Sequence, residues 1–355
     1  MTIIDGYFTQ MKERGASDLH MVIGFPPLLR LRGELVPLDE PVLTPESNRK
    51  ILFEILDEDQ QAAIDKNRDF DKAYALEGVG RFRCNLFYQQ RGIGAVFRII
   101  PAKILSVDQL GLPDVVRNFA DYVRGMVLVT GPTGSGKSTT MAAIIDLIND
   151  KHAKHIITIE DPLEFVHPNK KCVFSQREIG SHAISFGKAL SVANREDPDI
   201  ILVGEMRDLE TIALALTCAE LGILVFGTLH TNSAAKTIDR IINAFPADQQ
   251  AQTRTMLADS LKGVVAQQLL KTKDGKGRCA ALEILIGTNA LASIIRDGKI
   301  NQIESMIQTG TALGMQTMDQ HLQQLIDADK ITVEAAREKA MNKTLFPLPG
   351  GVEED

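Results

Sequence analysis

The sequence predicts an α/β protein, with a small N-terminal α+β unit followed by a larger domain built on a mostly parallel sheet. Two observations lead to this prediction. After about residue 118, short apolar runs alternate with segments of helical periodicity, the pattern of a parallel sheet covered by helices. One of these strand-to-helix turns, at residues 131–138, has the sequence GPTGSGKS, which is a phosphate-binding loop in its required context.

The first hundred residues show the pattern of the small α+β unit. A helix is predicted over Tyr7–Arg14, and Leu28–Val36 has the alternation of a hairpin with glycine in its turn. A second helix is predicted to begin at Thr44–Glu46, which combine a capping threonine, a first-turn proline and an early acid. Two strands, Gly80–Gln89 and Gly94–Ile100, complete the unit.

Proline and glycine indicate the domain boundaries. Pro101, Gly111 and Pro113 interrupt the chain between the two patterns, so we place the N-terminal domain at residues 1–100 and a connection at 101–118. The larger domain then covers residues 119–345. The tail at residues 346–355 is rich in proline, glycine and acidic residues, and we expect it to be frayed.

Composition excludes several classes of protein. The 355 residues suffice for about two domains, and 44% apolar and 24% charged residues exclude a mainly disordered chain. The net charge of −7 argues against nucleic acid as the main partner. The four cysteines include no CxxC pair, so no structural zinc site is expected and a reducing compartment is favoured. No segment resembles a secretory signal or a membrane-spanning helix.

The clearest motif follows the buried strand predicted at Met126–Thr130. Its glycines let backbone N–H groups point at phosphate oxygens, and the following helix adds its positive end. Lys137 is expected to reach the β- and γ-phosphates of ATP, and Ser138 to hold Mg²⁺. The residues expected to bind the nucleotide here are Gly131, Thr133, Gly134, Ser135, Gly136, Lys137, Ser138 and Thr139.

Carboxylates follow two further strands, and ligands of parallel sheets bind at the carboxyl ends of strands. The strand His155–Ile159 leads into Glu160, Asp161 and Glu164. Carboxylates beside a triphosphate would repel it unless they hold a metal ion or orient the attacking water. The strand Ile200–Val203 leads into Gly204 and Glu205, the form of a Walker B strand with glycine in the usual aspartate position.

Glu205 is therefore the carboxylate expected near Mg²⁺, through a water molecule. A fourth apolar run, Ile223–Leu229, leads into His230, which is placed to sense the γ-phosphate. The alternatives are a solvated acidic loop for the carboxylates and a hydrogen-bonded core histidine for His230.

Arginines gather at the end of the N-terminal unit. Arg81, Arg83, Arg91 and Arg98 fall within eighteen residues, and Arg81 and Arg83 point to one face of a strand. Arginine suits bidentate contact with phosphate, so these side chains are candidates to enter the site of a neighbouring subunit. The alternative is a solvated basic face of a sheet.

Four motifs, taken in order, make the chain similar to the secretion-type AAA-like ATPases: GPTGSGKST, ITIEDPLEF, DPDIILVGEMRD and FGTLHTNSAAKTIDRI. Within this superfamily the chain resembles the type IV pilus retraction (twitching motility) ATPases, the PilT/PilU group. The resemblance extends from SDLH near the N-terminus, through GRFRCN and VFRIIP, to QQLL and GMQTMDQ.

The resemblance implies a PAS-like N-terminal domain, a flexible linker and a RecA-like ATPase domain, assembled as a homohexamer with ATP and Mg²⁺ between subunits. Carried over to this sequence, Glu164 is the catalytic glutamate, with Glu160 and Asp161 beside it. Glu205 is the Walker B glutamate, and His230 belongs to the histidine motif. The matching arginines, which cross a subunit interface to ATP, are Arg83 and Arg98, with Arg81 as a further candidate.

The function implied is a cytoplasmic motor, docked peripherally on the inner-membrane platform protein at the pilus base, that hydrolyses ATP to retract the pilus. A paralogous retraction ATPase is a possible second partner, and no nucleic acid is expected. The alternatives are a pilus extension or type II secretion ATPase, an accessory paralogue that depends on a partner ATPase, a nucleic-acid translocase and a non-hydrolysing ring subunit.

Two departures from the pattern of retraction ATPases bear on these alternatives. Ile223 stands where such ATPases usually have a second histidine, and the stretch Ala290–Ile295 replaces their AIRNLI helix motif. The first concerns nucleotide sensing and the second concerns autonomous retraction.

Overall fold

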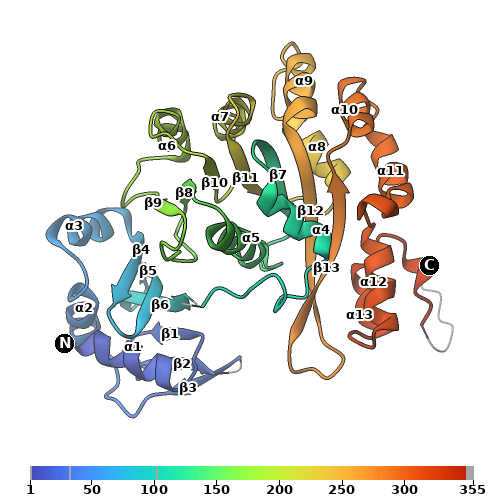
Figure 1. Cartoon of the computed structure of the whole chain (residues 1–355). Helices are drawn as coiled ribbons and strands as arrows, with labels where there is room; N and C mark the ends of the chain where they lie inside the picture. The colour runs from blue at the N-terminus through green and yellow to red at the C-terminus, as the bar shows by residue number, and fades with distance from the viewer. Residues whose placement is uncertain (1, 32, 101–102, 349–355) are drawn as a thin grey trace. The chain divides into compact units, whose positions relative to one another are not determined.

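The computed structural model describes residues 2–31, 33–100 and 103–348, and it divides into two compact units (Figure 1). The first unit holds the chain up to Lys103 together with Pro162–Val166, and the second holds Ile104–Asp161 and the chain from His167 onward. The predicted fold class is confirmed, because an antiparallel sheet forms in the first unit and a mostly parallel sheet in the second.

The sheet of the first unit is antiparallel, with strand order β3-β2-β1-β6-β5-β4 in the described residues. The elements are α1 (Ile3–Glu13), β1 (Asp18–Met21), β2 (Leu28–Leu31), β3 (Glu34–Pro37), α2 (Pro45–Phe53), α3 (Glu58–Asn67), β4 (Asp69–Leu76), β5 (Gly80–Gln89) and β6 (Gly92–Ile100). The predicted hairpin and both predicted strands are present. Phe8 of α1 stacks on Phe82 of β5 with ring centroids 4.0 Å apart, which joins the helix to the sheet.

Local capping fixes the helix starts in this unit. Thr44 accepts a hydrogen bond from the backbone of Ser47, so α2 begins where the sequence predicts. The first helix begins earlier than the predicted Tyr7, because Thr2 and Asp5 form a capping box at its N-terminus.

The second unit contains a sheet of order β13-β12-β7-β11-β10-β8-β9 in the described residues, parallel except where β13 pairs with β12 (Figure 1). Its strands are β7 (Gly125–Thr130), β8 (His155–Glu160), β9 (Val173–Glu178), β10 (Ile200–Val203), β11 (Leu224–Leu229), β12 (Leu261–Lys271) and β13 (Arg278–Ile286). β7 lies between β11 and β12, so the loop after β7 has a strand on either side.

Both faces of this sheet are covered, because side chains alternate along each strand. Met126 and Leu128 of β7 pack into one apolar cluster with α6 to α11, whereas Val127 and Val129 pack into another with α4 and α5. A third cluster joins α12 and α13 to β12 and β13. The helices are α4 (Asp114–Arg117), α5 (Lys137–Lys151), α6 (Phe186–Ala193), α7 (Leu209–Glu220), α8 (Ala234–Asn243), α9 (Gln250–Ser260), α10 (Asn289–Arg296), α11 (Ile303–Thr309), α12 (Met318–Asp327) and α13 (Val333–Lys339).

Two expected boundaries are wrong in part. Residues 104–118, expected to belong to a connection, are packed in the second unit because Val107, Leu112 and Val116 are buried there. The expected frayed tail begins too early, because Phe346 is 2% exposed and completes the cluster with α12 and α13. The rest of the expected connection at residues 101–102, and of the expected tail at 349–355, lies outside the described residues. No helix in the described part of the chain is long and apolar enough to cross a membrane.

Candidate active site

The predicted phosphate-binding loop joins β7 to α5 and has the backbone that its glycines allow. Gly131, Gly134 and Gly136 have φ values of 143°, 77° and 87°, in the region that side chains disfavour. At Gly131 the space is also closed, since an added Cβ would lie 2.2 Å from the carbonyl oxygen of Gln267. Ser138 and Thr139 follow in the first turn of α5, while Thr133 stands exposed at the tip of the loop.

Lys137 is folded back over this loop. Its side chain is buried, and Nζ donates to the carbonyl oxygens of Gly131 (2.9 Å) and Pro132 (3.1 Å). Within the described residues the buried hydroxyl of Ser135 has no hydrogen-bond partner. A lysine ammonium, an unpartnered hydroxyl and a helix N-terminus around one glycine loop are the groups that a polyphosphate needs. The residues present therefore fit a nucleoside triphosphate.

Gln267 of β12 holds the loop from the side. It is 2% exposed, its Nε2 donates to the carbonyl oxygen of Ser135 at 2.7 Å, and its Oε1 accepts from the hydroxyl of Thr140 at 2.7 Å. One side chain thus satisfies a loop carbonyl and a hydroxyl of α5 together. An added Cβ at Gly136 would lie 2.8 Å from the same Nε2 atom, so glycine is required there for this contact as well.

Glu205, after β10, is the centre of a charged cluster. Its Oε1 lies 2.6 Å from Nε of Arg207 and 3.0 Å from Nε2 of His230, which follows β11. Burial would raise the pKa of this carboxyl, but the hydrogen bond from Arg207 and the charges of His230 and Arg207 outweigh it and lower the pKa. Arg207 therefore pairs with Glu205 and not with Asp208, which instead caps α7 by accepting from the backbone of Thr211.

Glycine is favoured at position 204 because the backbones of β8 and β10 lie close together there. Its N–H donates to the carbonyl oxygen of Ile159 at 2.8 Å, and an added Cβ would lie 3.2 Å from that oxygen and from Cα of Glu160. The usual Walker B aspartate would press on this backbone. The same proximity brings Glu160, at the end of β8, to the edge of the sheet where Glu205 stands. The charge of Asp161 also contributes to raising the pKa of Arg207, after the larger effect of Glu205 itself.

Comparison with known protein families identifies the family of this chain. A family model described as "Type II/IV secretion system protein" matches residues 79–347. The chain belongs to this family. It is accordingly an ATPase of the secretion and pilus group, and the phosphate-binding loop and the Glu205–His230 cluster lie within the matched residues.

Individual members of the family are similar over nearly the whole chain. The type IV pilus retraction ATPase PilT of Pseudomonas aeruginosa is 52% identical over 328 residues, covering 92% of this chain and 95% of that protein. A twitching motility protein of Neisseria gonorrhoeae is 52% identical over 316 residues, covering 89% and 84%. The crystal structure of the pilus retraction motor PilT with bound ADP superposes with a TM-score of 0.91 at 45% identity, covering 97% and 98%.

The remaining predicted site residues lie in the first unit. Glu164 belongs to the segment Pro162–Val166, which groups with that unit, so its catalytic role stays a prediction. Arg83 and Arg98 face each other across β5 and β6, and Arg83 is exposed. Arg98 donates from Nε to Asp18 at 2.8 Å. Burial would raise the pKa of Asp18, but the hydrogen bonds from Ser17 and Arg98 lower it. Arg81 shares the strand face of Arg83.

The structure also shows where the two departures from the sequence pattern of retraction ATPases lie, at Ile223 and at Ala290–Ile295. Ile223 directly precedes β11, at the opposite end of that strand from His230. A residue at 223 therefore stands at the other edge of the sheet from the phosphate-binding loop. The stretch Ala290–Ile295 forms most of α10, and it buries Leu291, Ala292 and Ile295 in the core.

Two residues of the site were missed in the sequence. Gln267 lies within QQLL, a motif quoted for the resemblance, but nothing in its spacing links it to a loop more than a hundred residues earlier. Arg207 lies within the motif DPDIILVGEMRD but is not among the predicted site residues. Its position two residues after Glu205 was the available signal, since such neighbours beyond a strand end can fold back on each other.

Proposed function

We propose that the chain is the ATPase motor of type IV pilus retraction, and so powers twitching motility. The observation that carries this proposal is the match, over more than nine tenths of the chain and at 52% identity, to a named retraction ATPase. The phosphate-binding loop and the ion-paired Glu205 supply groups that such a motor needs to bind and hydrolyse ATP.

In this proposal ATP lies with its phosphates in the loop 131–138. Backbone N–H groups and Lys137 offset the charge of the β- and γ-phosphates. The hydroxyl of Ser138 would hold Mg²⁺, with Glu205 acting on it through water. When bound, the ion offsets negative charge on the phosphate oxygens. The residues fit such an ion because the hydroxyl of Ser138 and a carboxylate kept ionised by its partners follow β7 and β10, two parallel strands with β11 between them.

Hydrolysis then needs a positioned water. Glu164 orients this water and accepts its proton as the oxygen attacks the γ-phosphorus and the bond to the bridging oxygen of ADP breaks. His230 is hydrogen-bonded to Glu205, so loss of the γ-phosphate changes the surroundings of both groups together. Glu160 and Asp161 add the negative charge that keeps the cationic groups of this edge in place.

We propose that the sites are completed in a homohexamer. Arg83 and Arg98, with Arg81, enter the site of the next subunit and offset charge in the transition state. The N-terminal domain moves as a rigid body as each site cycles through ATP, ADP and empty states. The motor works at the cytoplasmic face of the inner membrane against the pilus platform protein, with a paralogous retraction ATPase as a further partner.

The test is steady-state ATPase activity with the mass of the species in solution. Wild-type chain should turn over ATP as a six-subunit species when Mg²⁺ is present, and chelation of Mg²⁺ should abolish turnover. Glu205→Ala and Arg83→Ala should each lower kcat by about 100-fold or more. Arg91→Ala is the matched control, because Arg91 is an exposed arginine of the same unit at the turn between β5 and β6.

Two outcomes would contradict the proposal. A hexamer that binds ATP without turnover would indicate an accessory subunit that depends on a partner ATPase. Cells lacking the gene should be hyperpiliated, since pili are still extended but not withdrawn. Cells without pili would indicate an extension motor instead.

A further inference from the structure

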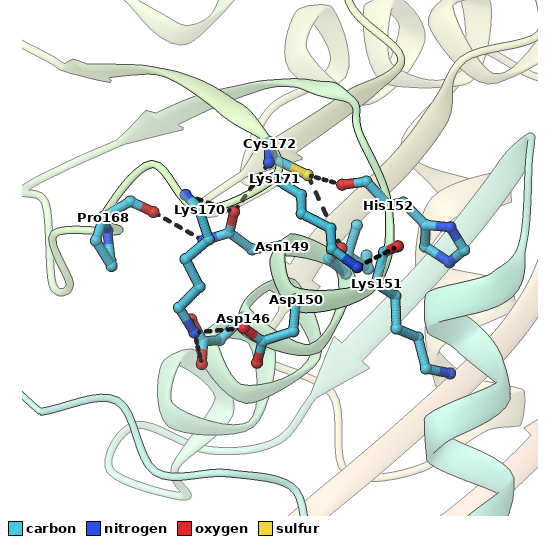
Figure 2. Close-up of polar contacts among 10 residues, drawn as sticks. Asp146, Asn149, Asp150, Lys151, His152, Pro168, Lys170, Lys171 and Cys172 are labelled. Atoms are coloured by element: carbon cyan, nitrogen blue, oxygen red, sulfur yellow. Dashed lines mark hydrogen bonds and ion pairs between the residues drawn. The ribbon is translucent and has the colours of Figure 1, made fainter.

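The loop that follows Glu164 is tied to the C-terminal end of α5, the helix that begins at Lys137. Figure 2 shows the side chain of Asn149 between the helix and this loop. Its Nδ2 donates to the carbonyl oxygen of Pro168 at 2.8 Å. Its Oδ1 accepts from the backbone N–H groups of Lys170 at 3.2 Å and Cys172 at 3.1 Å. Asn149 is fully buried, and its bond to Cys172 is buried, whereas its bonds to Pro168 and Lys170 are partly buried.

The backbone of the helix end contributes to the same tie. The carbonyl oxygen of Asn149 accepts from the N–H of Lys171 at 3.1 Å, and that of His152 accepts from the thiol of Cys172 at 3.0 Å (Figure 2). The last carbonyls of a helix have no partner within it, and here the loop supplies some of the missing donors. Residues 168–172 are therefore bonded to α5 through both side chain and backbone.

An ion pair strengthens the tie at the surface. Nζ of Lys170 lies 2.8 Å from Asp146 and 3.0 Å from Asp150, both on α5 (Figure 2). The pairs are partly exposed, so each contributes little by itself. The positive charge of Lys170 also stands near the negative end of the helix dipole, which favours the same position.

A second anchor precedes Pro168. His167 is 7% exposed, and its ring stacks on Phe174 of β9 with centroids 4.9 Å apart and planes 4° from parallel. Its backbone N–H donates to the side chain of Gln176 at 2.8 Å. The chain is thus held by β8 up to Glu160 and again from His167 onward. The segment between these two points, residues 161–166, contains Glu164 together with the buried Leu163 and Phe165.

We propose that Asn149 is a positioning residue for ATP hydrolysis, which fixes the loop 167–172 to the helix of the phosphate-binding loop and thereby restricts the positions open to Glu164. The proposal rests on the proposed function. Asparagine is suited to this role because one terminal group offers both donors and an acceptor with two lone pairs. Alanine at position 149 would leave the N–H groups of Lys170 and Cys172 without this acceptor. Leucine at position 149 would fill the space but form no hydrogen bond to the loop.

The experiment compares the full-length wild type with Asn149→Ala by ATPase kinetics, ADP binding and hydrogen exchange. A loosened loop misplaces Glu164 but not Lys137, so kcat should fall about 10- to 100-fold. The KM for ATP and the Kd for ADP should stay within about twofold, since binding uses the other end of α5. Peptides covering residues 169–173 should exchange faster, while those covering the phosphate-binding loop should not change.

Two further variants separate positioning from stability. Ile148→Ala opens a cavity in the same buried turn of α5 but removes no bond to the loop. It should keep wild-type kcat and wild-type exchange at residues 169–173, at a temperature where all variants are folded. Asn149→Asp keeps an acceptor for Lys170 and Cys172 but cannot donate to Pro168 when ionised, and its kcat should lie between those of wild type and Asn149→Ala.

Several results would overturn the proposal. Unchanged kcat in Asn149→Ala despite faster exchange would show that the tie does not reach catalysis. An equal loss of kcat in Ile148→Ala would show a purely structural role, and an equal loss of ADP affinity in Asn149→Ala would place the effect on nucleotide binding. A wild-type chain without turnover would contradict the proposed function, and the exchange data would then still decide whether Asn149 ties the loop.

Discussion

The side-chain amide of Gln267 on β12 lies 2.7 Å from the carbonyl oxygen of Ser135, a residue 132 positions away in the sequence. The same side chain accepts from Thr140 at 2.7 Å. The shape of the phosphate-binding loop is therefore set by a neighbouring strand as well as by the loop's own glycines. A buried hydrogen bond to a loop carbonyl fixes the orientation of the next peptide, and so of the N–H group that faces phosphate.

We predict that Gln267→Ala weakens nucleotide binding. The change leaves the carbonyl of Ser135 and the hydroxyl of Thr140 without this partner, at a cost of about 1–3 kcal/mol. The Kd for ADP should rise about tenfold, measured by calorimetry, and Tm should fall. Gln268→Ala is the control, because the side chain of this adjacent glutamine points to the other face of β12, where it donates to the carbonyl oxygen of Lys339 at 3.4 Å. Equal effects of the two changes would contradict this role.

We predict that restoring the usual Walker B aspartate does not improve this enzyme. Gly204→Asp places Cβ 3.2 Å from two backbone atoms of β8 and adds a carboxylate beside Glu160 and Glu205. Overpacking of this kind costs about 1–3 kcal/mol, which urea unfolding would measure. Gly6→Ala, in α1 with nothing within 4 Å of the added Cβ, should leave stability equal or higher. A Gly204→Asp variant as stable as wild type, with higher kcat, would refute the packing argument.

Acid should destabilise the fold below about pH 6.5 through a buried histidine. His321 of α12 accepts from the N–H of Leu282 at 2.9 Å, and burial lowers its pKa from 6.5 to about 4. The unfolded state therefore binds a proton between these values that the folded state does not bind. Stability is present above pH 6.5 and falls as the pH approaches 4, by up to about 1.4 kcal/mol per pH unit.

The variant His321→Asn isolates this contribution, because its amide oxygen replaces the acceptor without titrating. Its unfolding free energy should depend less steeply on pH between 6.5 and 4 than that of wild type. Some slope should remain, since burial also lowers the pKa of His167 to about 4. Identical slopes in urea titrations of the two proteins would show that His321 does not control this pH range.

We predict that Arg83 acts across the subunit interface, which mixing two inactive variants tests. An equimolar mixture of Arg83→Ala and Lys137→Ala subunits, exchanged and reassembled, leaves intact those interfaces where a normal Lys137 meets a normal Arg83. Random assembly should then restore about a quarter of wild-type activity. Lys137→Ala mixed with Glu205→Ala should restore none, because in this proposal both residues act in the site of their own subunit. No recovery in the first mixture would place Arg83 in its own subunit's site.

The parts that depend on residues close together in the chain could be predicted from the sequence. The phosphate-binding loop was predicted because its glycines, with φ values of 77° to 143°, are needed locally, and the strand ends bearing Glu160, Glu205 and His230 were predicted from apolar runs followed by polar groups. Local capping likewise fixed the start of α2 at Thr44. Prolines and glycines were a less reliable guide to the domain boundary. The prolines and glycines of residues 101–118 suggested a connection, but the apolar residues between them are buried.

Which of these parts come into contact depends on the three-dimensional fold. The order of strands places β12 beside β7 and β8 beside β10, which puts Gln267 on the loop and closes the space around Gly204. It also turns Arg207 and His230 onto one oxygen of Glu205, and it sets the loop after Glu164 on Asn149. Periodicity shows which face of an element is buried but not against which partner. That choice depends on packing between segments far apart in the chain.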